Sequence, residues 1–491
     1  MRDQAARRAI DPPGLDHSRL ARDTAWSTCL RAASALLSLT VAVAAHAQTA
    51  RPVVSQTSGS VPAGAATNEV RHLTLHDAVD MGLRYNLGAI ESTENVRVAR
   101  GQRLHALSSL LPQVSVGASY NRARVSAASI GLSSVPGFLI PAAIGPFGYS
   151  TIFASASQVV LNVESIRRLR AAQDAEQASS LSRNDMLDLV TLTVGNAYLQ
   201  VIDAGSRIDA TEAQVRNAQA LYNQASDALE AGTSPRIDVT RTAVQLHTEQ
   251  FNLTVARNTL AIARLNLARA IGLPLGQAFD LADRLPYADL DPLSVDDALR
   301  TAFESRADFR AAQEATESAQ HTVDAARAQR FPTLSVSGDY GRQGVTLGNT
   351  ERIFSLLAGA NVPIFTGRRI ESEQTQAEAA LQQRQAERED LRGQIDYDVR
   401  TALLNLQAAK EQVTVARENV ALANENLARS QERFAAGVTD SVEVVQAQQA
   451  LSDANDQFIS GAYSHNLAKL QFARAIGVAH TSYGHYLAGQ P

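Results

Sequence analysis

The sequence predicts a mixed fold in which coiled-coil α-helices form a barrel that continues into a transmembrane β-barrel. Three observations predict this fold. The chain contains two internal repeats, each repeat holds one very long proline-free segment with a helical pattern, and each holds two strands long enough to cross a bilayer.

The composition argues against nucleic-acid binding and against cysteine-based chemistry. The chain has 491 residues and a formal net charge of -5, and neither half is strongly basic, which excludes nucleic acid as the main partner. Its single cysteine, Cys29, lies in a segment that we expect to be removed. The remaining chain would then hold no disulfide, thiol nucleophile or thiolate metal site.

The first 47 residues resemble an export signal. Several arginines precede an apolar run over residues 32–45, and the run ends in the small-x-small pattern Ala45-His46-Ala47. The run is shorter than the roughly 20 residues of a membrane-spanning helix, and no later apolar stretch is long enough. We therefore expect a signal peptide over residues 1–47 and an exported protein without a membrane-spanning helix. A polar linker over residues 48–72 follows.

The rest of the chain is predicted to consist of two repeats, over residues 73–285 and 286–478, followed by a C-terminal tail over residues 479–491. The first repeat is predicted to carry about 15 additional residues within the glycine- and proline-rich stretch 126–149, which we interpret as a loop. Four pairs of segments carry the repeat: 73–78 with 293–298 and 111–116 with 331–336, both at a shift of 220 residues, and 231–232 with 436–437 and 269–272 with 474–477, both at a shift of 205 residues.

Each repeat is predicted to contain a long helix and a return helix. The long helices are expected over residues 164–231 and 368–436, and the return helices over residues 237–271 and 442–476. At 1.5 Å per residue, a long helix would measure roughly 100 Å. Apolar residues in both long helices recur in alternating steps of four and three, which indicates a left-handed coiled coil. This seam runs to Leu229 in the first repeat and to Phe434 in the second, and its first six positions are Val190, Val194, Ala197, Val201, Ala204 and Ile208, and Ile395, Val399, Ala402, Leu406, Ala409 and Val413.

The heptads alone leave two arrangements open. Leu192, Leu199 and Ile202 add apolar positions beside the seam, so the helix can have neighbours on both sides and form part of a tube. A plain coiled-coil rod fits the heptads equally well. The strands decide between the two arrangements.

Four strands are predicted, at about residues 113–124, 149–161, 333–345 and 352–365. Apolar and polar residues alternate after Pro112 and Pro332, which mark the helix-to-strand junctions. Two hairpins that cap a soluble rod are the alternative, but they would leave exposed edges. Lipid does not tolerate open edges, and four strands cannot close a barrel. Two copies would give eight strands around a filled interior, whereas three copies give twelve strands with room for a passage.

No catalytic constellation accompanies these features. The sequence contains no nucleophile elbow, phosphate-binding loop, dinucleotide fingerprint or zinc-protease motif. His72 and His76 are spaced as two ligands on a helix would be, but no third ligand is near them in the sequence. We therefore expect no enzymatic activity, no cofactor and no metal site.

Taken together, these features resemble the TolC-like outer-membrane efflux family. The duplication, the two proline-led hairpins and the segments 231–239 and 436–444 carry the resemblance, which extends from Leu73 to Gly477. It implies a homotrimer with a twelve-stranded barrel in outer-membrane lipid and a long α-helical tunnel in the periplasm. It also implies a passive conduit for the export of small molecules, completed by a periplasmic adaptor and an inner-membrane pump.

The resemblance also assigns candidate site residues. Acidic residues ring the narrow end of the tunnel in this family, and Glu443 aligns with the first of these positions, with Asp440 nearby and Asp238 as the equivalent in the first repeat. Gln446 occupies the next family position, and Thr439 replaces an arginine found in some relatives. Three like carboxylates around a pore would favour cations and raise the proton affinity of at least one of them. The alternative for Glu443 and Asp238 is a first-turn acid favoured by the helix dipole.

The turns between the long and return helices are predicted to dock the adaptor or pump. Gly232 and Gly437 permit the positive dihedral angles of a tight turn. The predicted docking residues are Gly232, Thr233, Gly437, Val438 and Thr439.

A periplasmic coiled-coil adaptor that bridges a pump without forming a pore is the alternative function. Adaptors of this kind carry one helical hairpin, whereas this sequence has two hairpin repeats and strands of spanning length.

Overall fold

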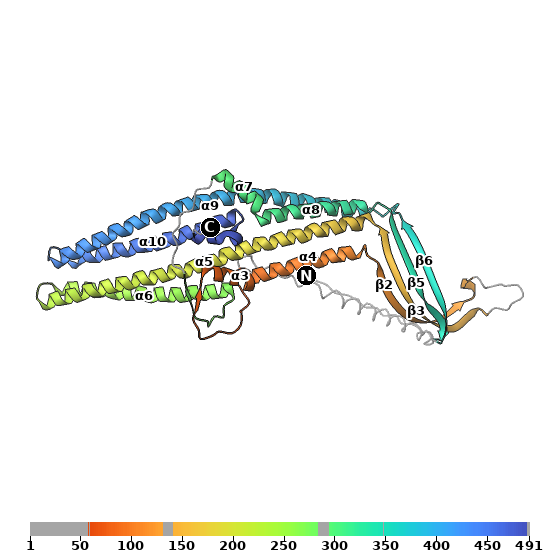
Figure 1. Ribbon diagram of the computed structural model, residues 1–491, viewed down its shortest axis with the longest axis horizontal. Helices are drawn as coiled ribbons and strands as arrows, with labels where there is room; N and C mark the ends of the chain where they lie inside the picture. The colour runs from red at the N-terminus through yellow and green to blue at the C-terminus, as the bar shows by residue number, and fades with distance from the viewer. Residues whose placement is uncertain (1–56, 58, 131–140, 283–293, 347, 489–491) are drawn as a thin grey trace, which may run out of the picture. The chain divides into compact units, whose positions relative to one another are not determined.

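The computed structural model describes residues 57, 59–130, 141–282, 294–346 and 348–488. The predicted signal peptide with Cys29, residues 48–56 and 58 of the predicted linker, and residues 489–491 lie outside this range. Within it, the order helix, helix, strand, strand, helix, helix occurs twice along the chain (Figure 1).

The first half comprises β1 (Arg71–Leu73), α3 (Leu75–Tyr85), α4 (Leu87–Ser108), β2 (Gln113–Ser126), the 3₁₀ turn η1 (Ala128–Ile130), β3 (Ala143–Leu161), α5 (Val163–Glu230), α6 (Arg236–Ile271) and β4 (Phe279–Leu281). The second half comprises α7 (Val295–Ser305), α8 (Ala307–Ala328), β5 (Thr333–Thr346), β6 (Asn349–Asn361), α9 (Arg369–Ala435), α10 (Ser441–Ala475) and α11 (Ala479–Ala488).

The two matching segments at the start of each half both begin a short helix. Thr74 caps α3 by accepting a hydrogen bond from the backbone of Asp77, and Ser294 caps α7 by accepting one from the backbone of Asp297. The hydroxyls of Thr74 and Ser294 in turn donate to these carboxylates and lower the pKa of both aspartates. Such reciprocal caps satisfy donors that a helix start otherwise leaves unpaired.

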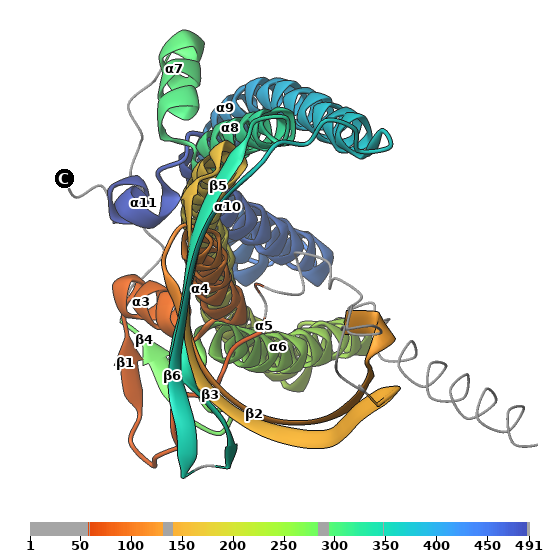
Figure 2. The same ribbon diagram turned by 90° about the vertical axis from the view of Figure 1, so that its right-hand side faces the viewer.

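The helices pack as a row in which each long helix contacts its own return helix. α5 packs against α6 and α10, and α10 packs against α9, so α6 and α9 lie at the two ends of this row (Figure 2). Nearer the sheet, α4 and α8 pack on α5, and α8 also packs on α9. The predicted seam residues are buried or half-buried, and Val190, Val194, Ile395 and Val399 are almost fully enclosed. None of the helices in the described ranges combines the length and the apolar character needed to cross a membrane.

The four long strands form one antiparallel sheet in the order β2-β3-β5-β6 (Figures 1 and 2). In the described part of the chain, β2 and β6 each have a strand neighbour on one side only. Val116 in β2 and Leu356 in β6 are both 77% exposed. The single chain therefore leaves both sheet edges, and much apolar strand surface, uncovered.

A second, smaller sheet was not predicted. β1 pairs in parallel with β4, and Arg71 lies opposite Phe279. β1 falls partly within residues 48–72, which we expected to be a linker. Strands of three residues are too short to show a period-two pattern, and the buried Leu73 and Phe279 provide the anchoring instead.

The boundaries of β3 and β6 differ from the expected ones. β3 begins at Ala143, inside the stretch 126–149 that we expected to be a loop. Its residues before Ser150 pair only with β2, because β5 joins β3 from Ser150 onward, and Pro146 falls at an irregularity of the ladder between the paired Ile144 and Phe147. A missing donor at Pro146 is tolerated where one side of a strand is free. β6 ends at Asn361, before Pro363, so residues 362–365 are not part of the strand.

The expected tail after residue 478 is instead partly a helix. α11 packs against α10 and α5, where Ala479 and Leu487 are buried. Its Tyr486 ring lies edge-on to Phe472 in α10, with the ring centroids 6.2 Å apart. These contacts explain why a short segment with little helical periodicity is ordered.

Candidate functional site at the hairpin tips

The two helical hairpins turn in the same way. Gly232 and Gly437 adopt φ values of 74° and 67°, a conformation that favours glycine. The backbone of the next residue in each turn donates back to the preceding helix, from Thr233 to Ala228 and from Val438 to Arg433, at 2.9 and 3.0 Å. Such bonds satisfy carbonyls that a helix end otherwise leaves unpaired. Val438 is 67% exposed, so the second turn presents an apolar side chain to its surroundings.

Asp238 links the two hairpins. It is buried at the start of α6, and Ser441, at the start of α10, donates to its Oδ1 at 2.7 Å. Arg241 donates from one nitrogen to both Asp238 and Ser441, at 3.2 and 3.0 Å, and Ser234 donates to the other carboxylate oxygen at 2.8 Å. The first-repeat acid is thus a structural junction within one chain.

Glu443 has a different environment, with its side chain 37% exposed. Arg433, near the end of α9, forms an ion pair with it at 3.2 Å, and the Thr439 hydroxyl donates to it at 2.6 Å. A basic residue of the same chain therefore compensates this carboxylate. Asp440 is the N-cap of α10 and accepts from the backbone of Val442 at 3.0 Å.

The two junction prolines precede their strands directly. Pro112 lies one residue before β2, and Pro332 lies one residue before β5. In both places the helix ends in a hydrogen-bonded turn, in which Leu111 donates to Ser108 and Phe331 donates to Ala328.

An ionic network lies where α7 meets α8. Arg306 is buried and bridges Asp308 and Asp398, with N–O distances of 2.6 and 3.0 Å. Nearby, Arg474 in α10 pairs with Asp185 in α5 at 2.5 Å. The network therefore joins α8, α9, α10 and α5.

The C-terminal helix is attached to the same region by polar contacts. His480 donates to the buried Asp188 from its backbone, and its ring nitrogen also lies 2.7 Å from that carboxylate. The ring of His76 is stacked on Tyr483, with the ring centroids 6.2 Å apart. These contacts tie α11 to α5 and α3.

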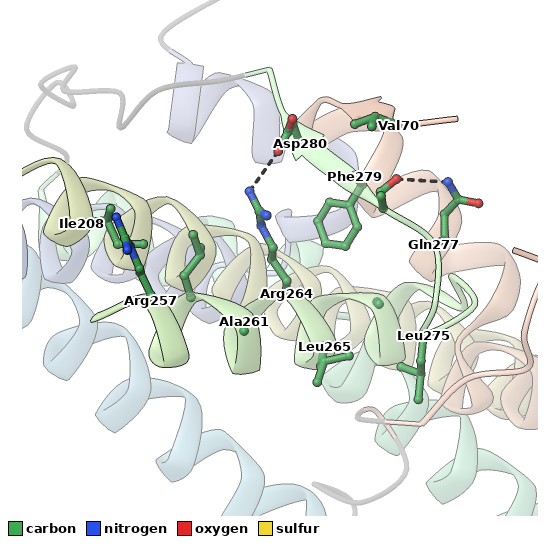
Figure 3. A pocket seen from close by; sticks show the side chains of 13 residues that line it. Val70, Ile208, Arg257, Ala261, Arg264, Leu265, Leu275, Gln277, Phe279 and Asp280 are labelled. Atoms are coloured by element: carbon green, nitrogen blue, oxygen red, sulfur yellow. Dashed lines mark hydrogen bonds and ion pairs between the residues drawn. The ribbon is translucent and has the colours of Figure 1, made fainter. Parts of the chain in front are cut away.

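A hollow of about 580 Å³ lies along α6 beside β4 (Figure 3). Its wall is apolar at Ile208, Leu265 and Phe279, and two arginines stand at its sides. Arg264 pairs with Asp280 at 2.9 Å, and Arg257 pairs with Glu212 at 3.0 Å. Because both guanidinium groups already pair with carboxylates, the two arginines do not make the hollow a binding site for an anion.

Within the described ranges, no three His, Cys, Asp or Glu side chains are placed together to hold a metal ion. His72 and His76 lie in different elements, at β1 and α3.

Sequence reasoning missed the residues that surround the predicted acids. Arg241 could have been suggested by its spacing of three from Asp238 on a helix. Ser441 and Arg433 had no such signal, because their contacts with Asp238 and Glu443 depend on how the hairpins fold.

Comparison with known proteins gives the family. The sequence model of the family described as outer membrane efflux protein matches the chain twice, over residues 91–273 and 298–478. These two matches cover well over half of the chain and fall one in each half of the fold.

Relatives and solved structures agree with this match. The pyoverdine export outer membrane protein OpmQ of Pseudomonas putida is 23% identical over 390 residues, which are 78% of this chain and 81% of the relative. The outer membrane protein TolC of Vibrio cholerae is 24% identical over 377 residues, 75% of this chain and 83% of the relative. The crystal structure of VceC from Vibrio cholerae has the same fold, with a TM-score of 0.70 at 18% identity over 82% of this chain and 96% of that one. The chain therefore belongs to the outer membrane efflux protein family, the family of TolC, and is located in the outer membrane.

Proposed function

We propose that this protein is a trimeric duct that lets small molecules leave the cell, as the outer-membrane channel of a tripartite efflux or secretion system. Three copies pool their strands into a twelve-stranded barrel, and their helices continue it as a tunnel through the periplasm. Relatives are named for the export of pyoverdine and of toluene, which supports small molecules as cargo.

The open edges of the four-stranded sheet carry this proposal. β2 and β6 offer unpaired backbone groups along apolar strands, and a bilayer does not tolerate such groups. Pairing β6 of one copy with β2 of the next satisfies them, and three copies leave space for a passage.

The ends of the helix row support the same arrangement. α6 carries an exposed apolar stripe on the side opposite α5, formed by Ile237, Val244, Phe251, Val255, Ile262 and Leu265. α9 also carries exposed apolar side chains at heptad-like spacing, Tyr397, Leu404, Val415 and Leu422, which we name the α9 stripe. We infer that the α6 stripe of one copy packs on the α9 stripe of the next, which buries both and closes the tube.

Charge also favours this pairing. α6 contains five arginines, and its two carboxylates, Asp238 and Glu249, are buried. Beside the α9 stripe, Glu411, Glu418 and Glu425 follow one another at seven-residue spacing and are exposed. Although Arg257 and Arg264 already pair with Glu212 and Asp280 within the chain, α6 itself contributes more arginines than carboxylates, and we infer that this edge meets the exposed glutamates of α9.

The hairpin tips are proposed as the entrance and as the docking surface for an adaptor and an inner-membrane pump. The docking residues are those of the two turns, Gly232, Thr233, Gly437, Val438 and Thr439. Glu443 and Asp440 are proposed to face the constriction, where Arg433 reduces the negative field of Glu443. Asp238 is proposed to shape the constriction indirectly, because its carboxylate is buried and accepts from Ser441 and so does not face the passage.

The family assignment does not favour the alternative of a pore-free adaptor, because the named relatives are outer-membrane proteins of efflux and export.

Purification of the full exported chain in mild detergent tests the proposal. We expect a particle with the protein mass of three copies by light scattering and a steady ionic current in a planar bilayer. A monomer under these conditions, or a trimer that never conducts, contradicts the duct. Recovery in the soluble or inner-membrane fraction would instead favour the adaptor.

A further inference from the structure

The turn between the sheet and α9 exposes unusually large apolar side chains. Ile364 is 96% exposed and Phe365 is 87% exposed, and Val362 beside them is 56% exposed. These residues follow the end of β6, so they do not belong to the ladder of strands that pairing between copies would extend. Figure 1 shows the turn where the strands meet the ends of α8 and α9.

This turn is fixed at both ends. Asn361 still pairs with Thr333 in the sheet, and Ile370, in the first turn of α9, is buried. Arg369 donates to Gln329 at the end of α8 at 2.8 Å and pairs with Glu373 at 2.7 Å. The exposed apolar side chains therefore lie on a turn whose two ends are fixed by the sheet and by α9.

A basic residue stands directly beside them. Arg368 adopts a φ of 68°, which is uncommon for a residue with a side chain, and its side chain is 87% exposed. Its partner Glu371 lies 3.3 Å away and is 61% exposed. Exposed pairs of this kind contribute little, so the guanidinium can exchange this carboxylate for a phosphate oxygen.

We propose that residues 362–369 form an interface anchor that binds anionic phospholipid in the leaflet nearer the helices. Ile364 and Phe365 enter the boundary between headgroups and acyl chains, and Arg368 binds the lipid phosphate. Apolar residues next to arginine at the end of a membrane-spanning element suit this boundary. Phe331, between α8 and β5, is 55% exposed and is a further apolar side chain at this end of the sheet.

This inference rests on the proposed function, because it requires the sheet to cross the membrane. It adds a lipid-binding segment outside the strands. A neighbouring copy is the other possible cover for Ile364 and Phe365, and the experiment must separate the two.

Tryptophan reporters make this separation, because the only tryptophan of the chain, Trp26, lies in the predicted signal peptide. The reporters are Phe365→Trp in the anchor, Phe354→Trp in β6 and Val438→Trp at the hairpin tip, each in the full chain reconstituted into phosphatidylcholine vesicles with phosphatidylglycerol. Lipids brominated near the glycerol end and deep in the acyl chain serve as quenchers. We expect the anchor reporter to be quenched by the shallow bromines and the tip reporter by neither.

The β6 reporter distinguishes the two levels of failure. If it is not quenched by brominated lipid, the sheet is not in the bilayer and the proposed function fails. If it is quenched while the anchor reporter is not, the duct stands and the anchor is wrong. An anchor reporter that is shielded from both lipid and aqueous iodide would show that a second copy covers it, which also overturns the anchor.

The charge is tested separately with brominated phosphatidylglycerol as a minor component. One basic side chain near an anionic surface contributes on the order of 1 kcal/mol, so Arg368→Gln should lower the preference for this lipid about fivefold. Arg429→Gln removes an arginine from an exposed pair on α9 and should leave the preference unchanged. Equal effects of both substitutions would contradict a phosphate contact at Arg368.

Discussion

Asp238 holds together two segments that are far apart in the chain, so its removal should destabilise both of them. Asp238→Ala leaves Arg241 and the buried Ser441 without their shared acceptor. Each unpaired buried group costs about 1–3 kcal/mol. We expect faster amide hydrogen exchange at the start of α10, in the other hairpin.

Asp440→Ala is the matched control for that experiment. It removes an N-cap that serves only α10, a loss of about 0.5–2 kcal/mol confined to one helix start. Its effect should not reach the turn between α5 and α6. If Asp238→Ala speeds amide exchange only in the hairpin of α5 and α6, then Asp238 does not stabilise the start of α10 and the proposed link between the two hairpins is wrong.

Arg306 is the residue whose loss should destabilise the chain most. Its side chain is only 5% exposed, and Arg306→Met leaves Asp308 and Asp398 without their cation. Breaking a buried pair in this way costs about 3–5 kcal/mol. Arg300→Met breaks an exposed arginine–aspartate pair at 69% exposure and should cost about 1 kcal/mol or less. Thermal unfolding in detergent compares the two, and similar losses would contradict the role of the network.

Two aspartates near this network should respond to acid with opposite signs. Burial alone would raise the pKa of Asp308, but the hydrogen bond and the charge of Arg306 outweigh burial and hold this pKa below its usual value. Its stabilisation is therefore complete above the unfolded pKa, about 3.9, and is lost as the pH falls through the lower folded value. Burial raises the pKa of Asp185, in spite of Arg474. The folded state then binds that proton more tightly, and stability falls as the pH rises from about 3.9 through the folded value.

Substitution by asparagine separates the two effects. Asp308→Asn should flatten the loss of stability in acid, whereas Asp185→Asn should remove a gain that wild type shows on acidification. Unfolding midpoints measured between about pH 3 and 6 cover the unfolded value and its surroundings. Parallel pH profiles for the two variants would contradict the assigned signs.

At the scale of elements, the apolar stripe on α6 should decide assembly. Phe251 is 68% exposed in one chain, and in the proposed trimer it is buried against α9 of the next copy. Phe251→Asp would place a charge in that contact and forfeit about 1.5–3 kcal/mol of apolar burial in each copy. We expect light scattering to find mainly monomers.

Gln250→Asp provides the comparison, because Gln250 is exposed on the same helix but lies about 100° or more around the helix from Val244, Phe251 and Val255. It should leave the trimer intact. Trimers that survive Phe251→Asp would place the contact between copies elsewhere.

The elements also show which parts of this structure a sequence can predict. The long helices were readable because steps of four and three persist through α5 and α9, and burial follows that seam from Val190 onward. The start of β3 was not readable, since Gly145 and Pro146 resemble a loop until the flanking Ile144 and Phe147 are known to pair with β2. α11 was missed because its order comes from contacts such as Leu487 with α10, not from its own pattern.

The candidate site follows the same division. The turn glycines were identified from the sequence because a positive dihedral angle is a local demand. The partners of Asp238 and Glu443 were not, because Ser441 and Arg433 reach them only across the folded tips. The local backbone demand was therefore predictable, whereas contacts made by the folded tips were not, whether they join residues about 200 apart, as Ser441 and Asp238 are, or residues of one hairpin, as Arg433 and Glu443 are.

At the scale of the whole molecule, the decisive question is whether β6 of one copy meets β2 of another. Within one chain the two edges are separated by three strand spacings, roughly 14 Å, far beyond the reach of a disulfide. A Val116→Cys, Leu356→Cys variant can therefore form a bond only between copies. Since Cys29 lies in the predicted signal peptide, no other thiol should compete.

Oxidation of this variant in membranes should give a ladder on a non-reducing gel that stops at three chains, because a closed ring leaves no edge for a fourth. Each single variant should remain unlinked, and moving the second cysteine among residues 354–358 finds the register. Products longer than three chains would mean open edges that continue to add copies. No product at any of these positions would mean that the sheets do not join at all, and the twelve-stranded barrel would then be wrong.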